Sequence, residues 1–113
     1  MVADLAGGPV LAVPAVLIER IVQHYDPIEV ILFGNHARGE AGPDSDWDLL
    51  VVVDDDTPPE KLRLHYAYQA IAETRIAADV VPVRASRFRE RSSVVNTLSN
   101  WAAMEGKVVY ARA

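Results

Sequence analysis

The sequence predicts a single α/β (α+β) domain in which a small mixed β-sheet is flanked by helices. Three apolar runs of strand length, at residues 29–33, 47–53 and 78–83, alternate with segments whose apolar residues recur at helical spacing. The 113 residues, half of them hydrophobic, suffice for one domain with one core. Because strands and helices alternate, we expect the helices to pack against the faces of a sheet.

Local signals in the sequence support each predicted element. Pro14 suits the first turn of a helix, and apolar residues follow it at helical spacing. Thr57 with Glu60 three residues later has the capping-box pattern of a helix start. In chain order, the expected elements are a helix at 14–25, a strand at 29–33, a helical turn at 35–38, a loop at 42–45, a strand at 47–53, a helix at 57–74, a strand at 78–83, an irregular or helical Arg-rich segment at 84–91, a helix at 94–105 and a strand at 108–110.

The sequence also predicts how two of these elements are placed. Pro82 cannot donate a hydrogen bond to a neighbouring strand, so its strand is expected to lie at a sheet edge or to end there. The last helix is expected to turn its apolar residues toward the core. Those residues are Val94, Val95, Leu98, Trp101 and Ala102.

Charge and composition limit the possible functions. The net charge is −5, and residues 26–60 carry ten acidic side chains and one basic one. Such a patch argues against direct nucleic-acid binding, which requires cations, and suits a metal site; a solvated acidic loop is the alternative for residues 54–56. Without cysteine, disulfides and cysteine zinc sites are excluded. The apolar N-terminal stretch lacks a basic segment and contains prolines, so we expect neither a signal peptide nor a membrane span, and a cytoplasmic location.

Two carboxylates open an apolar strand just after a glycine turn. Asp46 and Asp48 are two residues apart, so in a strand they point the same way. Close carboxylates repel unless one takes a proton or a cation binds between them. Oxygen ligands without cysteine favour Mg²⁺ or Mn²⁺ over zinc. The alternative is that Asp46 binds loop amides.

Asp79 is the third candidate carboxylate, because an isolated charge in its apolar segment would be costly. If its strand lies beside the second strand, Asp79 joins the pair. Three aspartates could then hold two metal ions about 3.5–4 Å apart, an arrangement suited to in-line displacement at phosphorus. Alternatively, Asp79 forms an ion pair with Arg75 or Arg84.

The glycine turn has features of a phosphate-binding loop. Gly34 follows a strand and would let the backbone approach an anion closely. Asn35 can donate a side-chain hydrogen bond to a phosphate oxygen, and Arg38 lies one helical turn later. Each of these features is common in ordinary turns, and it is their fixed order before the aspartates that indicates a site.

This ordered set resembles the minimal nucleotidyltransferase family of the DNA polymerase β-like superfamily. The family pattern is Gly-Ser, a spacer with Ala-Arg-Gly, then Ser-Asp-x-Asp-Leu and a later Asp. The chain has Asn35 where the pattern has Ser. The matching residues are Gly34, Asn35, Ala37, Arg38, Gly39, Ser45, Asp46, Asp48, Leu49 and Asp79.

The resemblance implies a fold and an activity. Asp46, Asp48 and Asp79 would be the catalytic and metal-binding residues, holding two Mg²⁺ ions, with Asp79 as the base. The nucleotide would be held by Gly34, Asn35, Arg38 and Ser45. The reaction would transfer AMP from ATP to a hydroxyl, expected to be a tyrosine of a HEPN ribonuclease toxin, and the chain would act as an antitoxin.

Two other functions remain open at the level of sequence. Because position 35 is Asn, the chain could instead neutralise a toxin by binding alone. It could also modify a small hydroxyl compound, since an acidic face attracts cationic acceptors. The short chain has no evident second domain to bind such an acceptor, which favours a protein partner.

Overall fold

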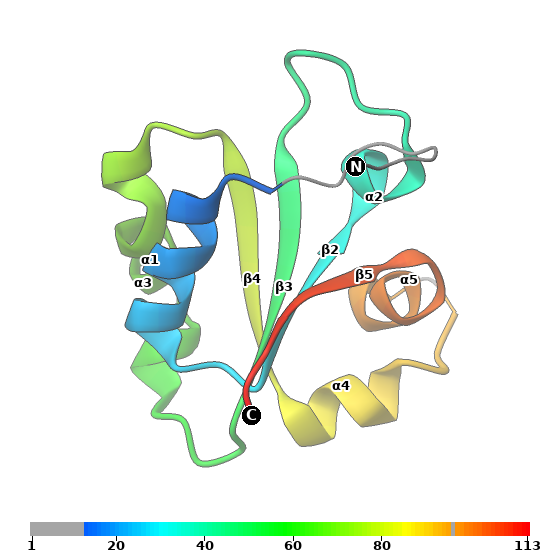
Figure 1. Cartoon of the computed structure of the whole chain (residues 1–113). Helices are drawn as coiled ribbons and strands as arrows, with labels where there is room; N and C mark the ends of the chain where they lie inside the picture. Colours follow the sequence, from blue (N-terminus) through cyan, green and yellow to red (C-terminus); the bar gives the residue numbers. More distant parts are fainter. Residues whose placement is uncertain (1–12, 96) are drawn as a thin grey trace.

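A computed structural model of the protein describes residues 13–95 and 97–113 and contains a four-stranded sheet with helices on both faces (Figure 1). The strand order is β4-β3-β2-β5. β2 pairs antiparallel with β3 and with β5, whereas β3 and β4 are parallel, so the predicted mixed sheet is confirmed. The strands are β2 (Glu29–Phe33), β3 (Trp47–Val53), β4 (Ala78–Arg84) and β5 (Lys107–Ala111).

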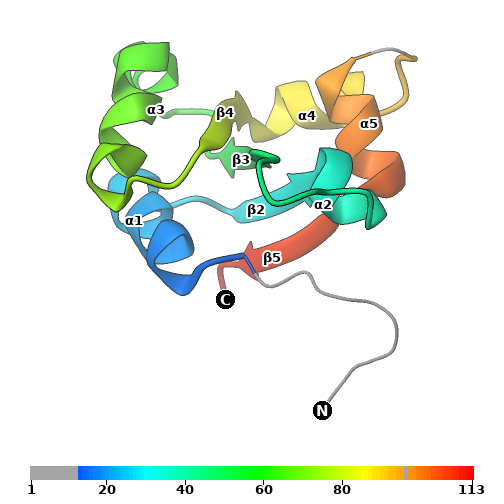
Figure 2. The same ribbon diagram turned by 90° about the horizontal axis from the view of Figure 1, so that it is seen from above.

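Helices cover both faces of the sheet. Figure 2 shows α1 and α3 on one side and α4 and α5 on the other, with α2 at one end of the strands. The helices are α1 (Ala15–Tyr25), α2 (Gly34–Arg38), α3 (Leu64–Ile71), α4 (Ala85–Arg91) and α5 (Leu98–Glu105), and two 3₁₀ turns are η1 (Pro59–Leu62) and η2 (Ala72–Thr74).

The larger core lies between the sheet and α1 and α3. Leu17, Ile21 and Tyr25 recur every four residues along α1 and are buried against the sheet. Alternate β3 residues face them, including Leu49 and Val51. Each such aliphatic side chain contributes about 1.5–3 kcal/mol when fully buried. This core fixes the positions of β3 and β4.

The opposite face has a smaller core, and α5 packs on it through a side that the sequence did not predict. Ile31, Phe33, Leu50 and Val52 are buried there with Ala102 of α5. The prediction that the apolar residues of the last helix point inward was wrong, apart from Ala102. α5 instead buries Ser99, Asn100 and Ala102, and the exposed residues are Val94, Val95, Leu98 and Trp101.

The predicted helix at 57–74 is divided into η1, α3 and η2. Arg63 adopts an extended conformation between η1 and α3 and so interrupts the helix. The Thr57 side chain makes no capping hydrogen bond to η1, which begins after Pro58. The break leaves Leu64 and Tyr68 exposed while α3 packs on the sheet through smaller residues, Ala67 and Ala70, and through Ile71.

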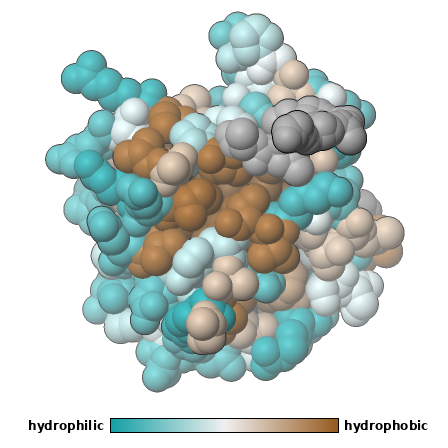
Figure 3. Space-filling view, in the orientation of Figure 1, coloured by the Kyte–Doolittle hydropathy of each residue, from teal (hydrophilic) through white to brown (hydrophobic). Residues whose placement is uncertain are grey.

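Two further sequence predictions concern the surface. β4 is an edge strand, as Pro82 predicted. Among the described residues, no helix is both long and apolar enough to cross a membrane. Figure 3 shows hydrophobic side chains gathered near the middle of the face seen in Figure 1, with hydrophilic ones around them.

Candidate active site

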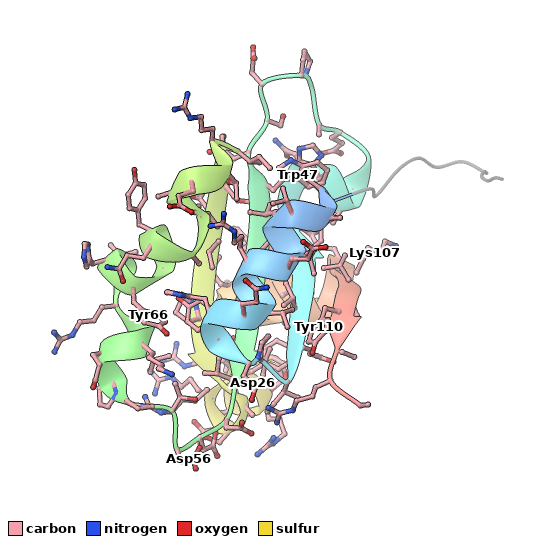
Figure 4. The ribbon with its side chains drawn as sticks, turned by 60° about the vertical axis from the view of Figure 1, so that its left-hand side comes forward. Asp26, Trp47, Asp56, Tyr66, Lys107 and Tyr110 are labelled. Atoms are coloured by element: carbon pink, nitrogen blue, oxygen red, sulfur yellow. The ribbon has the colours of Figure 1, made fainter. Side chains whose placement is uncertain are left out.

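The predicted site residues gather where three strand ends meet. β2 runs into α2, while β3 and β4 both begin at this same end of the sheet. Figure 4 shows Trp47, the first residue of β3, at this end and Asp56 at the opposite end. The topology therefore brings the glycine turn and the strand aspartates together, although they are far apart in sequence.

Asp48 and Asp79 are direct cross-strand neighbours. They pair in the parallel register of β3 and β4, and both lie on the sheet face that α4 and α5 cover. The prediction that the strand of Asp79 lies beside the second strand is confirmed. Neither alternative ion pair of Asp79, with Arg75 or Arg84, is formed; Arg84 instead donates to the backbone carbonyls of Asp55 and Thr57.

The pKa of Asp48 is raised by its surroundings. Partial burial raises the pKa of the Asp48 carboxyl above its ordinary value, and the nearby charges of Asp79 and Asp46 raise it further. The protonated Asp48 carboxyl could also donate to the Asp79 carboxylate, which raises this pKa further, whereas the nearby His36 opposes the rise. The pair therefore favours either a shared proton or a bound cation.

The donor chemistry of this pair fits Mg²⁺. Mg²⁺ commonly binds one or two carboxylates and takes its remaining ligands from water and substrate phosphates. Within residues 13–95 and 97–113, no three His, Cys, Asp or Glu side chains are grouped closely enough to form a complete metal site. Asp46 is exposed and affects Asp48 through charge. The roles of Asp46, Asp48 and Asp79 as metal ligands stay a prediction.

Gly34 lies directly against the Asp48 carboxylate. Its φ of +75° is in the left-handed region that favours glycine. A Cβ atom placed on Gly34 would lie 2.1 Å from Asp48 Oδ2, so no other residue fits unless the carboxylate moves. The glycine turn therefore positions a catalytic candidate as well as exposing backbone.

Arg38 hydrogen-bonds to Asn35 and to a residue of α5. Arg38 donates to Asn35 Oδ1, to Glu40 at 2.9 Å and to Glu105 at 2.7 Å. Because the Asn35 oxygen accepts from Arg38, its amide nitrogen is the group that it can offer to a phosphate. Arg38 thus connects α2 to α5, and its contact with a nucleotide stays a prediction.

Ser45 and His36 shape the loop before the aspartates. Ser45 Oγ accepts from the Gly42 amide at 3.0 Å, and the Ser45 amide donates to the Gly42 carbonyl. His36 Nε2 donates to the Ser45 carbonyl at 3.1 Å, and its ring stacks on Trp47 with centroids 3.6 Å apart. The sequence left His36 open between ligand contact and solvent exposure, whereas the structure gives it this structural contact.

An apolar cleft of about 300 Å³ opens beside the carboxylate pair. Leu98, which was predicted to point toward the core, is instead an exposed residue of the cleft lining, as are Leu64 and Tyr68 of α3. Exposed apolar side chains beside predicted catalytic residues indicate a binding surface. The sequence contains these side chains but does not show that they are exposed, so the cleft was not predicted. The cleft is lined by Phe33, Asp48, Leu64, Ala67, Tyr68, Ile71, Ala78, Asp79, Val80, Val81 and Leu98.

Comparisons with known proteins agree with this arrangement. Residues 15–100 match the model of the family described as "Nucleotidyltransferase domain". No curated protein matches significantly. A Sulfolobus solfataricus protein with a provisional nucleotidyltransferase assignment is similar in structure, with a TM-score of 0.54, 17% identity, and coverage of 85% of this chain and 75% of that chain.

A second solved structure is also similar. It is a toxin–antitoxin structure determined with AMP-PNP, with a TM-score of 0.58 and 21% identity over 85% of this chain and 72% of that chain. At these identities the two likenesses support the fold, whereas the family match extends over most of the chain. The chain therefore belongs to the nucleotidyltransferase domain family.

Proposed function

We propose that the chain is a Mg²⁺-dependent nucleotidyltransferase that transfers AMP from ATP to a hydroxyl group, expected to be a tyrosine, of a HEPN-type toxin, and so acts as an antitoxin. The observation that carries the proposal is the registered pair of Asp48 and Asp79 beside Gly34, at the mouth of an apolar cleft. Family membership supports nucleotidyl transfer, and the similar toxin–antitoxin structure with AMP-PNP supports the choice of nucleotide and partner.

In this proposal the residues of the chain have distinct roles. Gly34 backbone and the Asn35 amide bind the triphosphate, and Asp48, with Asp46, provides carboxylate oxygens for Mg²⁺. Mg²⁺, when bound, neutralises charge on the phosphates. Asp79 accepts the proton of the acceptor hydroxyl, whose oxygen bonds to the α-phosphorus. The bond between the α-phosphorus and its bridging oxygen then breaks, and pyrophosphate leaves.

The proposed transfer is tested with ATP labelled at the α-phosphate. The purified chain, Mg²⁺ and the product of the neighbouring gene are mixed, and label on that protein is measured. Asp48→Asn and Asp79→Asn should each abolish labelling, while Asp44→Asn, an exposed loop carboxylate, should not. Labelling that survives both site variants would contradict the assigned roles.

A binding-only antitoxin is the second candidate. Arg38 is already paired with Glu40 and Glu105, which reduces the positive charge available to a triphosphate. This candidate requires complex formation without ATP and full neutralisation of the toxin by the Asp48→Asn/Asp79→Asn double variant. A double variant that binds the toxin but fails to neutralise it would exclude the candidate.

A further inference from the structure

The outer edge of β4 has unused backbone hydrogen-bonding groups. No described strand pairs with this edge. The Trp47 amide donates to the Ala77 carbonyl, so the odd-numbered residues of the segment point their backbone groups toward β3. Ala78, Val80 and Pro82 therefore point theirs outward. Pro82 has no N–H to offer, and its position on the outer side explains why the strand tolerates it.

Three hollows with shared lining residues lie along this edge. The cleft of about 300 Å³ beside the carboxylates shares Val81 and Leu98 with a second hollow of about 330 Å³. The second shares Pro82, Val83 and Arg87 with a third of about 540 Å³. We call these three adjoining hollows together the edge groove.

The edge groove lies between helices of both layers. Figure 2 shows β4 between α3 and α4 at the side of the sheet away from β5. Tyr68 of α3 lines one wall, and Leu98 of α5 lines the other. The walls are mainly apolar beside the carboxylates and become polar and charged toward α4.

The two ends of the edge groove carry opposite charge. Asp48 and Asp79 lie at one end. Arg87 and Arg91 lie beside Val83, toward the other end, and neither forms an ion pair in the described part of the chain. Glu90 also lines this end, which keeps a net positive charge because the two arginines outnumber it. An occupant with an acidic group at the arginine end would therefore be favoured, and the same groove would disfavour a uniformly acidic segment.

We propose that the edge groove binds an extended segment of the partner protein beside β4 and so delivers the acceptor hydroxyl to Asp48 and Asp79. This inference rests on the proposed transfer function and adds how the acceptor is recognised. An added strand would hydrogen-bond to the outward groups of Ala78 and Val80 and to the Pro82 carbonyl. Because Pro82 lacks a donor, pairing is strongest next to the carboxylates.

Strand geometry predicts the pattern of the segment. Residues rise about 3.3 Å each along a strand, and every second side chain faces the same way. Asp79, Val81 and Val83 lie successively along the α5 side of β4. The segment should therefore carry a hydroxyl residue opposite Asp79, an apolar residue two positions away against Leu98, and an acidic residue four positions away near Arg87 and Arg91.

The binding test uses a nine-residue peptide that fits this pattern in either chain direction. The fluorescein-labelled peptide EQVQYQVQE is titrated with the full chain, without nucleotide, and binding is measured by fluorescence anisotropy. Saturable binding is expected. A peptide with lysine in place of both glutamates, and one with N-methylated backbone amides, should each bind at least tenfold more weakly. Absence of saturable binding by EQVQYQVQE would overturn the inference.

Matched variants of the chain locate the bound peptide. Leu98→Asp should weaken binding at least tenfold, whereas Met104→Asp, on the same helix but outside the groove, should not. Arg87→Glu/Arg91→Glu should weaken it similarly, and Arg89→Glu, an exposed residue of the same helix, should not. Circular dichroism checks that each variant is folded. Equal losses in the test and control variants would contradict binding in the groove.

The same variants allow the groove inference and the proposed transfer function to be tested separately. If the partner protein is labelled equally by wild type and by Leu98→Asp, the groove inference fails and the proposed function stands. If the peptide binds as expected but no label is transferred to the partner, the proposed function fails and the groove stands. A dimer of the chain that Leu98→Asp dissociates would instead assign the groove to a second copy and overturn the inference.

Discussion

Gly34 and Asp48 are packed so closely that a Cβ on Gly34 would lie 2.1 Å from the Asp48 carboxylate oxygen. We therefore predict that Gly34→Ala destabilises the protein and displaces Asp48. The positive φ costs about 1–2 kcal/mol for a residue other than glycine. The overlap adds about 1–3 kcal/mol if it behaves like overpacking elsewhere in proteins. Denaturant unfolding measures the total.

A double-mutant cycle separates these two costs. In an Asp48→Ala background the carboxylate is gone and the nearest remaining Asp48 atom is its Cβ, at 3.2 Å. Gly34→Ala should then cost little more than the φ strain, so the two substitutions should be non-additive by about 1 kcal/mol or more. Additive effects would show that the close contact carries no strain.

Asp48→Asn is predicted to stabilise the metal-free protein slightly. Asparagine keeps the size of the side chain and removes one of three crowded negative charges. Because the site is partly exposed, we expect a gain of no more than about 1 kcal/mol. Thermal unfolding with EDTA measures it, with Asp44→Asn as the control, and a lower melting temperature for Asp48→Asn would contradict the predicted charge repulsion.

Mg²⁺ should reverse the order of stability between wild type and Asp48→Asn. A ligand that binds the folded state stabilises it, by about 1.4 kcal/mol at tenfold excess over its Kd. Wild type should therefore melt at a higher temperature as MgCl₂ is added, and Asp48→Asn should not respond. An equal response of both proteins would place any bound Mg²⁺ elsewhere.

Tyr25→Phe is predicted to increase stability. The Tyr25 side chain is 5% exposed, and its hydroxyl has no hydrogen-bond partner among the described residues. Burial of an unpaired hydroxyl costs about 1–3 kcal/mol, so its removal should raise the free energy of unfolding by about 1 kcal/mol.

The matched control for Tyr25→Phe is Tyr66→Phe. The Tyr66 hydroxyl donates to the His24 carbonyl at 2.7 Å, so its loss should lower the free energy of unfolding by about 0.5–1.5 kcal/mol. The two rings contact each other edge to face, which keeps their surroundings comparable. A stability loss in Tyr25→Phe would show that its hydroxyl is satisfied.

The sequence allowed the carboxylate pair to be predicted because local signals agree there. Asp48 and Asp79 each interrupt an apolar strand near its start, which marked them in the sequence, although in the structure Asp79 is exposed and Asp48 is only partly buried. Their parallel register then follows from the sheet topology. By contrast, Arg38 pairs with Glu105, which lies 67 positions away, and no local pattern predicts such a contact.

The orientation of α5 shows where a prediction from apolar residues fails. A helix of this composition has two possible inner faces, and the apolar rule selects the one with Leu98 and Trp101. In the structure α5 instead packs on the sheet through its small residues, because the chain at the end of α5 approaches β2 closely. A Cβ on Gly106 would lie 2.5 Å from the Ile31 side chain. The close approach to the sheet, which sequence periodicity does not contain, decides the orientation.

Asp55 is predicted to make stability depend on pH in the acidic range. Asp55 Oδ1 accepts from the Ser86 amide at 2.9 Å in the first turn of α4, and this hydrogen bond lowers the pKa of the Asp55 carboxyl. A carboxyl whose pKa is lower in the folded state stabilises the protein above its unfolded pKa of about 3.9, and this contribution is lost as the pH falls through the folded value.

The melting temperature of Asp55→Asn should therefore lie below that of wild type by a constant amount above about pH 5, and the difference between the two melting temperatures should narrow below about pH 4. Asp56→Asn, at the exposed neighbouring position, should show no such gap. A gap for Asp55→Asn that stays constant down to pH 2.5 would contradict the ionic character of the Ser86 contact.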